Sequence, residues 1–234
     1  MKSLAYIFAF WGLCAASCDT PSPAFNTCVS ILIDRTDPVT ICPTAQSIVS
    51  GIGLRANPAM GLQIRIGYIS DMDINSTVAL TLDSESFFNG NATIRAAQVQ
   101  RFIATVQRSL DSMKAAGTCQ HSVIYRTVAT QANYLSRLSA AHKYLLVLSN
   151  MLEHSTVSFY DPATLRVLKV HPDTIAQQFE RDEPLVNLTG VDMWFLYDPT
   201  SYADNASFMN VAGFFKTVFE KHGATVHLDK QFMP

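Results

Sequence analysis

The chain alternates short apolar runs with longer amphipathic stretches. The runs that are short enough for β-strands and are bounded by turn-forming residues cover 29–34, 62–69, 78–82, 144–148, 191–196 and 225–228. Residues 62–69 and 78–82 alternate between apolar and polar positions on either side of the turn-like stretch 70–73, which predicts an antiparallel hairpin. Residues 29–33 are apolar except for Ser30 and end at Asp34, as expected of a strand buried on both faces of a sheet.

The stretches between these runs have apolar residues at helical spacing or signals for helix ends. A first helix is expected from about Pro43 to before Pro58, and a second from Asn91, where Val99 to Met113 carry apolar residues at helical spacing. Further helices are expected at 124–138, at 171–181 and across the Phe-rich stretch 208–219, which Gly223 is suited to terminate. Strands that alternate with helices predict an α/β fold with a doubly wound, mostly parallel, Rossmann-like sheet and one antiparallel edge hairpin.

The first residues do not belong to this pattern. An apolar run at 4–16 follows Lys2 and precedes Cys18, and it is shorter than the roughly 20 residues that a membrane-spanning helix needs. The stretch Ala15-Ala16-Ser17-Cys18 resembles the lipobox of bacterial lipoproteins, which implies cleavage before Cys18 and acylation of that residue. The resulting interpretation is a signal peptide at 1–17, a lipidated cysteine and tether at 18–27 and one domain at 28–234. Plain secretion is the alternative.

Composition narrows the choice of partners. The net charge is −2, charged residues make up 15%, and the chain has no cluster of basic residues, which disfavours binding to nucleic acid. The resemblance to a lipoprotein signal implies a membrane, through the lipid anchor, and the expected partner is an envelope or extracellular protein. The expected location is the bacterial cell envelope.

The candidate chemistry lies just after the predicted strands, because ligands of such sheets bind at the carboxyl ends of the strands. Asp34, Thr36 and Asp37 follow the first strand, and Ser149 and Asn150 follow the strand at 144–148. With the order of elements, the Asp-X-Thr after the first strand and the stretch His121-Ser122-Val123-Ile124-Tyr125 before a helix, residues 28–230 resemble the von Willebrand factor type A domain.

That resemblance implies a degenerate metal-ion-dependent adhesion site. The family holds a divalent cation, usually Mg²⁺, with an Asp-X-Ser-X-Ser loop, a Thr before a mid-domain helix and an Asp after the fourth strand. The matching positions here are Asp34, Thr36, Ser122 and Asn150, while Pro38 replaces the second Ser of the loop. Asp37 is a further oxygen donor in the same loop. A vestigial site that binds no metal is the alternative.

Three cysteines follow Cys18 in the chain. Cys42 and Cys119 are both expected at the carboxyl-end edge of the sheet, while Cys28 lies about 20 Å away at the other end of the first strand, at roughly 3.3 Å per residue. A Cys42–Cys119 disulfide is therefore the preferred pairing for an oxidising envelope.

The chain lacks the residues that define several enzyme classes. Thr36 stands where a haloacid-dehalogenase-like phosphatase has its second carboxylate, and the chain contains no Gly-X-Ser-X-Gly elbow and no Gly-rich turn after the first strand. The leading hypothesis is a non-enzymatic, membrane-anchored module that binds a protein. A metal-dependent envelope phosphoesterase that uses Asp34 and Asp37, and a metal-free scaffold, remain open.

Overall fold

The computed structural model describes residues 25–36, 41–70, 77–85 and 91–234, and its centre is a sheet of six strands in the order β3-β2-β1-β4-β5-β6. All neighbouring strands are parallel except β2 and β3, which form the antiparallel edge pair. The expected fold class is therefore confirmed. The strands are β1 (Thr27–Asp34), β2 (Leu62–Ile69), β3 (Thr77–Leu82), β4 (His142–Leu148), β5 (Val191–Leu196) and β6 (Thr225–Asp229).

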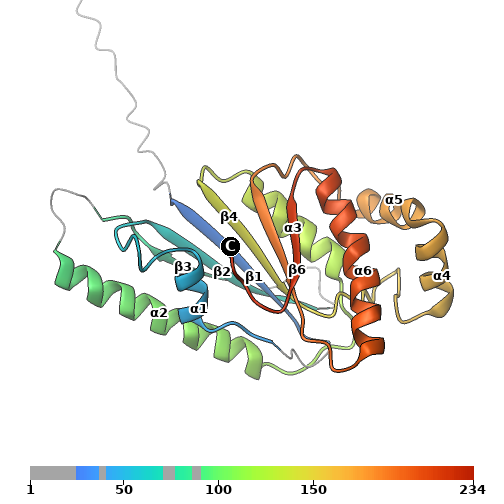
Figure 1. Ribbon diagram of the computed structural model, residues 1–234, viewed down its shortest axis with the longest axis horizontal. Helices are drawn as coiled ribbons and strands as arrows, with labels where there is room; N and C mark the ends of the chain where they lie inside the picture. Colours follow the sequence, from blue (N-terminus) through green and yellow to red (C-terminus); the bar gives the residue numbers. More distant parts are fainter. Residues whose placement is uncertain (1–24, 37–40, 71–76, 86–90) are drawn as a thin grey trace, which may run out of the picture.

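Helices cover both faces of the sheet and create two apolar cores. On one face α1 (Ala45–Gly51) and α2 (Ala92–Ala115) pack against the strands, with Ile48, Phe102 and Val106 in the core. On the other face α3 (Ile124–Ser136) and α6 (Tyr202–Lys221) pack with α4 (Pro162–Val170) and α5 (Pro172–Asp182) around an aromatic cluster that includes Tyr125 and Phe215. In Figure 1, α2 runs along the sheet on the side of β3, and α4, α5 and α6 gather on the opposite side.

Burial follows directly from the apolar runs. All eight residues of β1 are buried, because the strand lies at the centre of the sheet and is covered by both helical layers. Its side chains divide between the cores, with Ile31 and Ile33 facing α1 and α2, and Leu32 facing the other layer. The chain folds in this way because alternate strand residues point to opposite faces.

Side chains at the helix starts fix several boundaries. Asn91 caps α2 by accepting hydrogen bonds from the backbone N–H groups of Thr93 and Ile94, and Ser201 caps α6.

The helix α4 was not expected from the sequence. It begins at an Asp161 cap followed by Pro162, and it is short, with Leu168 as its one buried residue and Leu165 partly buried against the same core.

The order of the strands creates the position for a site. From β1 the chain passes to β2 on one side, and after β3, α2 and α3 it returns as β4 on the other side. The connections therefore diverge at the carboxyl ends of β1 and β4, which is where open α/β sheets bind ligands. Within the described ranges, no helix is long and apolar enough to cross a membrane.

Candidate functional site at the carboxyl ends of β1 and β4

Asp34 is the last residue of β1, and its carboxylate is the centre of the site. The residue is only 3% exposed. Its Oδ1 accepts two hydrogen bonds from Thr36, from the backbone N at 3.0 Å and from Oγ1 at 2.7 Å. This local turn fixes the rotamer of Asp34 and places the Thr36 hydroxyl beside it.

Two serines from distant segments complete the cluster. The Ser122 Oγ lies 3.1 Å from each oxygen of Asp34 and donates a bifurcated hydrogen bond, and the Ser149 Oγ donates to Oδ2 at 2.6 Å. Both serines are buried. Asp34 thus accepts from four donor groups, which matches the roughly four lone-pair positions of a carboxylate.

Backbone bonds hold the two serines in place. Ser122 and His154 form an isolated antiparallel bridge, with N···O distances of 3.2 Å and 2.9 Å, and Val123 N donates to Ser70 O at 3.2 Å. After β4 the chain turns at Met151, a buried non-glycine residue with a φ of 63°, and Met151 N donates to Ser149 Oγ at 2.8 Å. Positive φ at a bulky residue is strained, so the surrounding fold must impose this turn.

The structure places the expected site residues unequally. Asp34, Thr36 and Ser122 come together, and the side chain of the β4 loop that bonds to Asp34 is that of Ser149, the residue before the expected metal ligand Asn150. The Asn150 Oδ1 accepts instead from Leu152 N at 2.9 Å, within its own loop. Asp37 and the expected lipidation site Cys18 lie outside the described residues.

Glu153 is a second carboxyl group of this region that sequence reasoning missed. It is 1% exposed, and its Oε2 accepts from the backbone N of Tyr125 at 2.8 Å. Because the N-cap residue of α3, Val123, makes no side-chain cap bond, Glu153 supplies the acceptor at this helix start from another segment. Burial raises the pKa of Glu153 to about 7, against the lowering effect of its hydrogen bonds with Ser155, Tyr125 and Ile124, and the charge of Asp34 adds to the increase.

The rim of the site carries rings and one cation. The ring centroids of His121 and His154 are 4.5 Å apart, and Tyr160 lies 5.4 Å from His154. Arg35 follows Asp34, stacks over the Tyr68 ring at 4.7 Å and donates to Gly117 O. Because His154 pairs with Ser122 and Arg35 follows Asp34, these partly exposed groups adjoin the buried hydroxyl cluster.

The cysteines of the described residues, Cys28, Cys42 and Cys119, are free thiols, and the expected Cys42–Cys119 disulfide is not formed in the structure. Cys119 does lie at the expected edge, because its backbone N donates to Arg35 O at 2.9 Å. Burial raises the pKa of the Cys42 thiol, while nearby Lys114 lowers it.

The donor set has the chemistry of a magnesium site with few protein ligands. Mg²⁺ prefers hard oxygen ligands, keeps several waters and is commonly held by one or two carboxylates. Asp34 offers one carboxylate, and Thr36, Ser122 and Ser149 offer three hydroxyls within hydrogen-bonding distance of it. Within the part of the chain that the structure describes, no three His, Cys, Asp or Glu side chains form a metal-binding group, so hydroxyls and waters would have to complete the shell.

Comparison with protein-family models and with curated proteins gives no match. Among solved structures, the chain is similar to the D319A mutant of the PilB minor pilin from Streptococcus sanguinis, with 9% identity and a TM-score of 0.49, over 89% of this chain and 57% of the pilin. It therefore spans little more than half of the pilin's length.

Two further solved structures come from Bacteroides species. The conserved hypothetical protein BatB from Bacteroides thetaiotaomicron is 8% identical, with a TM-score of 0.37 over 88% of this chain and 91% of that chain. An aerotolerance-related membrane protein from Bacteroides fragilis is 8% identical, with a TM-score of 0.32 over 88% and 93%. Function is therefore inferred from the geometry of this chain.

Proposed function

We propose that the protein is a non-enzymatic binding module of the cell envelope, which holds a protein partner through a divalent cation at the carboxyl ends of β1 and β4. One observation carries the proposal. Hydroxyl groups from three separate segments converge on the buried Asp34 at the point where the strand connections diverge. Such convergence of oxygen donors at a switch point favours a ligand site over a local cap.

In this proposal Asp34, Thr36 and Ser122 hold Mg²⁺, with Ser149 as a further oxygen donor. The cation would offer a coordination position to an acidic group of the partner. The residues of the chain fix the geometry beforehand, because the turn at Thr36 and the bridge between Ser122 and His154 set the positions of the oxygens. Such preorganisation reduces the ordering cost of binding.

The envelope location and the membrane anchor are part of the same proposal. They are supported by the apolar run at 4–16 and by Cys18 after three small residues, which together resemble a lipoprotein signal. A lipid on Cys18 would hold the domain close to a membrane, and the stretch before β1 would act as the tether. The expected partner is an envelope or extracellular protein.

Calorimetric titration of Mg²⁺ and Mn²⁺ tests the cation. The variant Asp34→Asn removes the charge with almost no change in shape, and Asp229→Asn is the matched control. Asp229 also ends a parallel strand and accepts hydrogen bonds from the next backbone N–H groups, at 2.6 Å and 3.2 Å, but it lies at the far edge strand β6. We expect binding heat in the wild type and in Asp229→Asn, and none in Asp34→Asn.

A metal-free docking site is the second candidate, and a specific observation favours it. The Asp34 carboxylate is already satisfied by four donor groups of the protein, so the cluster is stable as a structural centre without a cation. Wild-type protein that gives no heat with either metal would exclude the cation-bridged mechanism and leave this reading.

A further inference from the structure

Within the described residues, the edge strand β3 carries none of the charges, prolines or bulges by which proteins commonly protect an exposed sheet edge. It is the last strand on its side of the sheet, and the described residues place no strand beyond it. The sequence Thr-Val-Ala-Leu-Thr-Leu has no charge and no proline, and its six residues pair with β2 in unbroken register, without a bulge. Val78, Ala79 and Thr81 are exposed. Uncharged, unbulged edges of this kind are templates for pairing with another strand.

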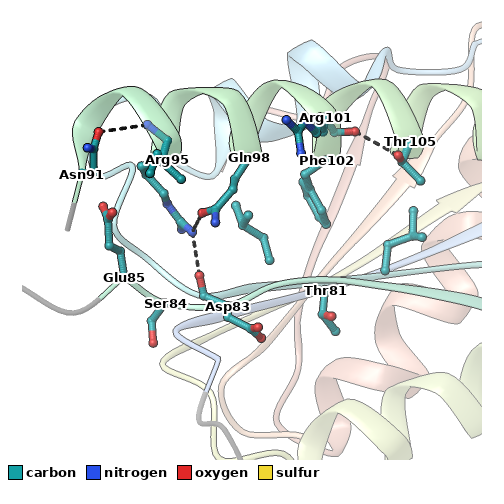
Figure 2. Close-up of a pocket in the computed structure, with 13 residues that line it drawn as sticks. Thr81, Asp83, Ser84, Glu85, Asn91, Arg95, Gln98, Arg101, Phe102 and Thr105 are labelled. Atoms are coloured by element: carbon teal, nitrogen blue, oxygen red, sulfur yellow. Dashed lines mark hydrogen bonds between the residues drawn. The ribbon is translucent and has the colours of Figure 1, made fainter. Parts of the chain in front are cut away.

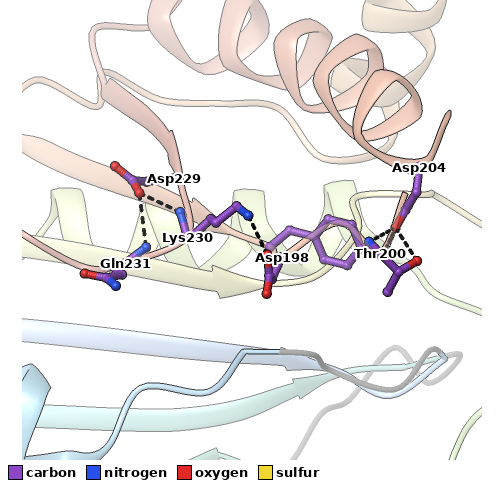
Figure 3. A network of polar contacts seen from close by, with 7 residues as sticks. Asp198, Thr200, Asp204, Asp229, Lys230 and Gln231 are labelled. Carbon is purple, nitrogen blue, oxygen red and sulfur yellow. Dashed lines mark hydrogen bonds and ion pairs between the residues drawn. The ribbon is translucent and has the colours of Figure 1, made fainter. Parts of the chain in front are cut away.

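The opposite edge is protected. The Nζ of Lys216 on α6 donates to Val226 O in β6 at 2.6 Å. One backbone carbonyl of that strand therefore already accepts a hydrogen bond from a charged group. The strand ends at Asp229, and the next residue, Lys230, forms an ion pair with Asp198 at 2.6 Å (Figure 3). The two edges of the sheet therefore differ. The β6 edge is protected, whereas the β3 edge is bare and available to pair with another strand.

A groove accompanies the bare edge. A cavity of about 630 Å³ lies between β3 and the first half of α2, with the apolar side chains of Leu80, Ile94 and Phe102 in its lining. Figure 2 shows Asp83 and Glu85 beyond the end of β3, with Arg95 beside them, and Arg101 farther along α2. Arg95 is only 4% exposed, because it donates to backbone carbonyls, so the exposed charges at this end of the groove are acidic, and Arg101 is an exposed positive charge farther along.

We propose that the occupant is a second copy of this chain, with the two β3 strands paired antiparallel about a twofold axis. Antiparallel pairing of identical edges needs only backbone hydrogen bonds, and no like charges oppose one another because β3 is uncharged. The twofold axis also makes the grooves of the two copies run in opposite directions. It brings the acidic end of each copy, at Asp83 and Glu85, toward the half of the partner's groove that carries Arg101.

The pairing has a geometric consequence for the candidate site. Thr77 at the start of β3 pairs with Gly67 near the end of β2, so the start of β3 lies at the same edge of the sheet as Asp34. Antiparallel pairing points the carboxyl edges of the two sheets in opposite directions. The dimer joins the two six-stranded sheets into one and presents its two Asp34 sites at opposite ends.

Sedimentation and light scattering of the purified protein measure the mass, and two matched variants locate the interface. Thr81→Lys places a charge on the exposed edge of β3, and Thr225→Lys places the same charge at an exposed threonine of the other edge strand, β6. We expect twice the mass of one chain for the wild type and for Thr225→Lys, and half of that mass for Thr81→Lys. Circular dichroism should show all three proteins folded.

Hydrogen exchange provides the second readout. The amides of β3 should exchange more slowly as the wild-type concentration rises, and this concentration dependence should vanish in Thr81→Lys. A wild-type monomer at all concentrations would overturn the proposal and leave the edge to a strand of another protein. A dimer that survives Thr81→Lys, or assemblies larger than a dimer, would also overturn it.

Discussion

Glu153 shows how a single buried residue can make stability depend on pH. Its carboxyl group is enclosed by the fold and receives the N–H of Tyr125 at the start of α3. Desolvation raises the pKa from an ordinary 4.5 to about 7, so the folded protein holds this proton more tightly than the unfolded chain does. Between these two values the free energy of unfolding therefore falls as pH rises, and above about 7 the cost of the buried charge is complete.

The variant Glu153→Gln should remove this pH dependence, because the amide oxygen can still accept from Tyr125 N but carries no charge. We expect the variant and the wild type to be similarly stable near about pH 4, and the variant to be more stable at about pH 8, by on the order of 3 kcal/mol. Urea unfolding across this range in the presence of a chelator measures the difference. Asp182→Asn, at an exposed position of α5, is the control. Parallel pH curves for Glu153→Gln and the wild type would contradict the expectation.

At the residue scale, the sequence predicted the part of the site that follows from strand ends. Asp34 and Thr36 were proposed because they follow the first strand, and Ser122 was proposed from a family resemblance of residues 121–125; the structure brings the three side chains together. The choice between Ser149 and Asn150 depends on the turn at Met151, whose positive φ no local pattern predicts. Glu153 was missed because the burial of a carboxyl group depends on tertiary packing around α3.

At the element scale, α2 is held to the sheet by a buried arginine. The guanidinium of Arg95 donates to the backbone carbonyls of Pro58, Asp83 and Met60, at 2.6 Å, 2.8 Å and 2.9 Å, and the residue is 4% exposed. One side chain thus joins the first turn of α2 to the loop before β2 and to the end of β3. Figure 2 shows Arg95 reaching from the helix toward Asp83.

Arg95→Met keeps the length of the stem but leaves three carbonyls without this donor. We expect the free energy of unfolding to fall by about 2–4 kcal/mol, since buried acceptors that lose a charged donor are costly. Arg108→Met on the same helix is the control, because Arg108 is exposed and its hydrogen bonds among the described residues are to Ala104 O and Thr105 Oγ1 of its own helix. Its effect should stay within about 0.5 kcal/mol. Equal losses in the two variants in denaturant unfolding would show that Arg95 does not anchor α2.

Most elements could be predicted because their burial is periodic. The hairpin of β2 and β3 was predicted from alternation at period two, and α2 from apolar residues at helical spacing. The boundaries shifted by a few residues, as at α1, which ends at Gly51 well before Pro58. The helix α4 lies on the surface with Leu168 as its one buried residue. The feature of the sequence that could have predicted it is therefore the N-cap Asp161 followed by Pro162.

At the scale of the whole molecule, the two sheet edges decide how copies of the protein meet. In a dimer through β3, both β3 edges are paired with each other. The assembly stops at two copies only while the β6 edges remain protected. Lys216 is central to that protection, because it binds Val226 O and also forms an ion pair with Glu220 at 3.1 Å. The topology that creates the site between β1 and β4 thus also leaves two edges with opposite behaviour.

Lys216→Met should convert the protected edge into a second bare edge. The substitution keeps the apolar stem of the side chain but frees Val226 O and removes the charge, so β6 edges of different molecules can pair. We expect a loss of about 1 kcal/mol in the free energy of unfolding and, in light scattering, species larger than a dimer that grow with concentration. Lys221→Met, near the end of the same helix, should leave the mass unchanged. If the two variants scatter alike, Lys216 does not guard the edge, and the charges around Asp229 and Lys230 must protect β6 without it.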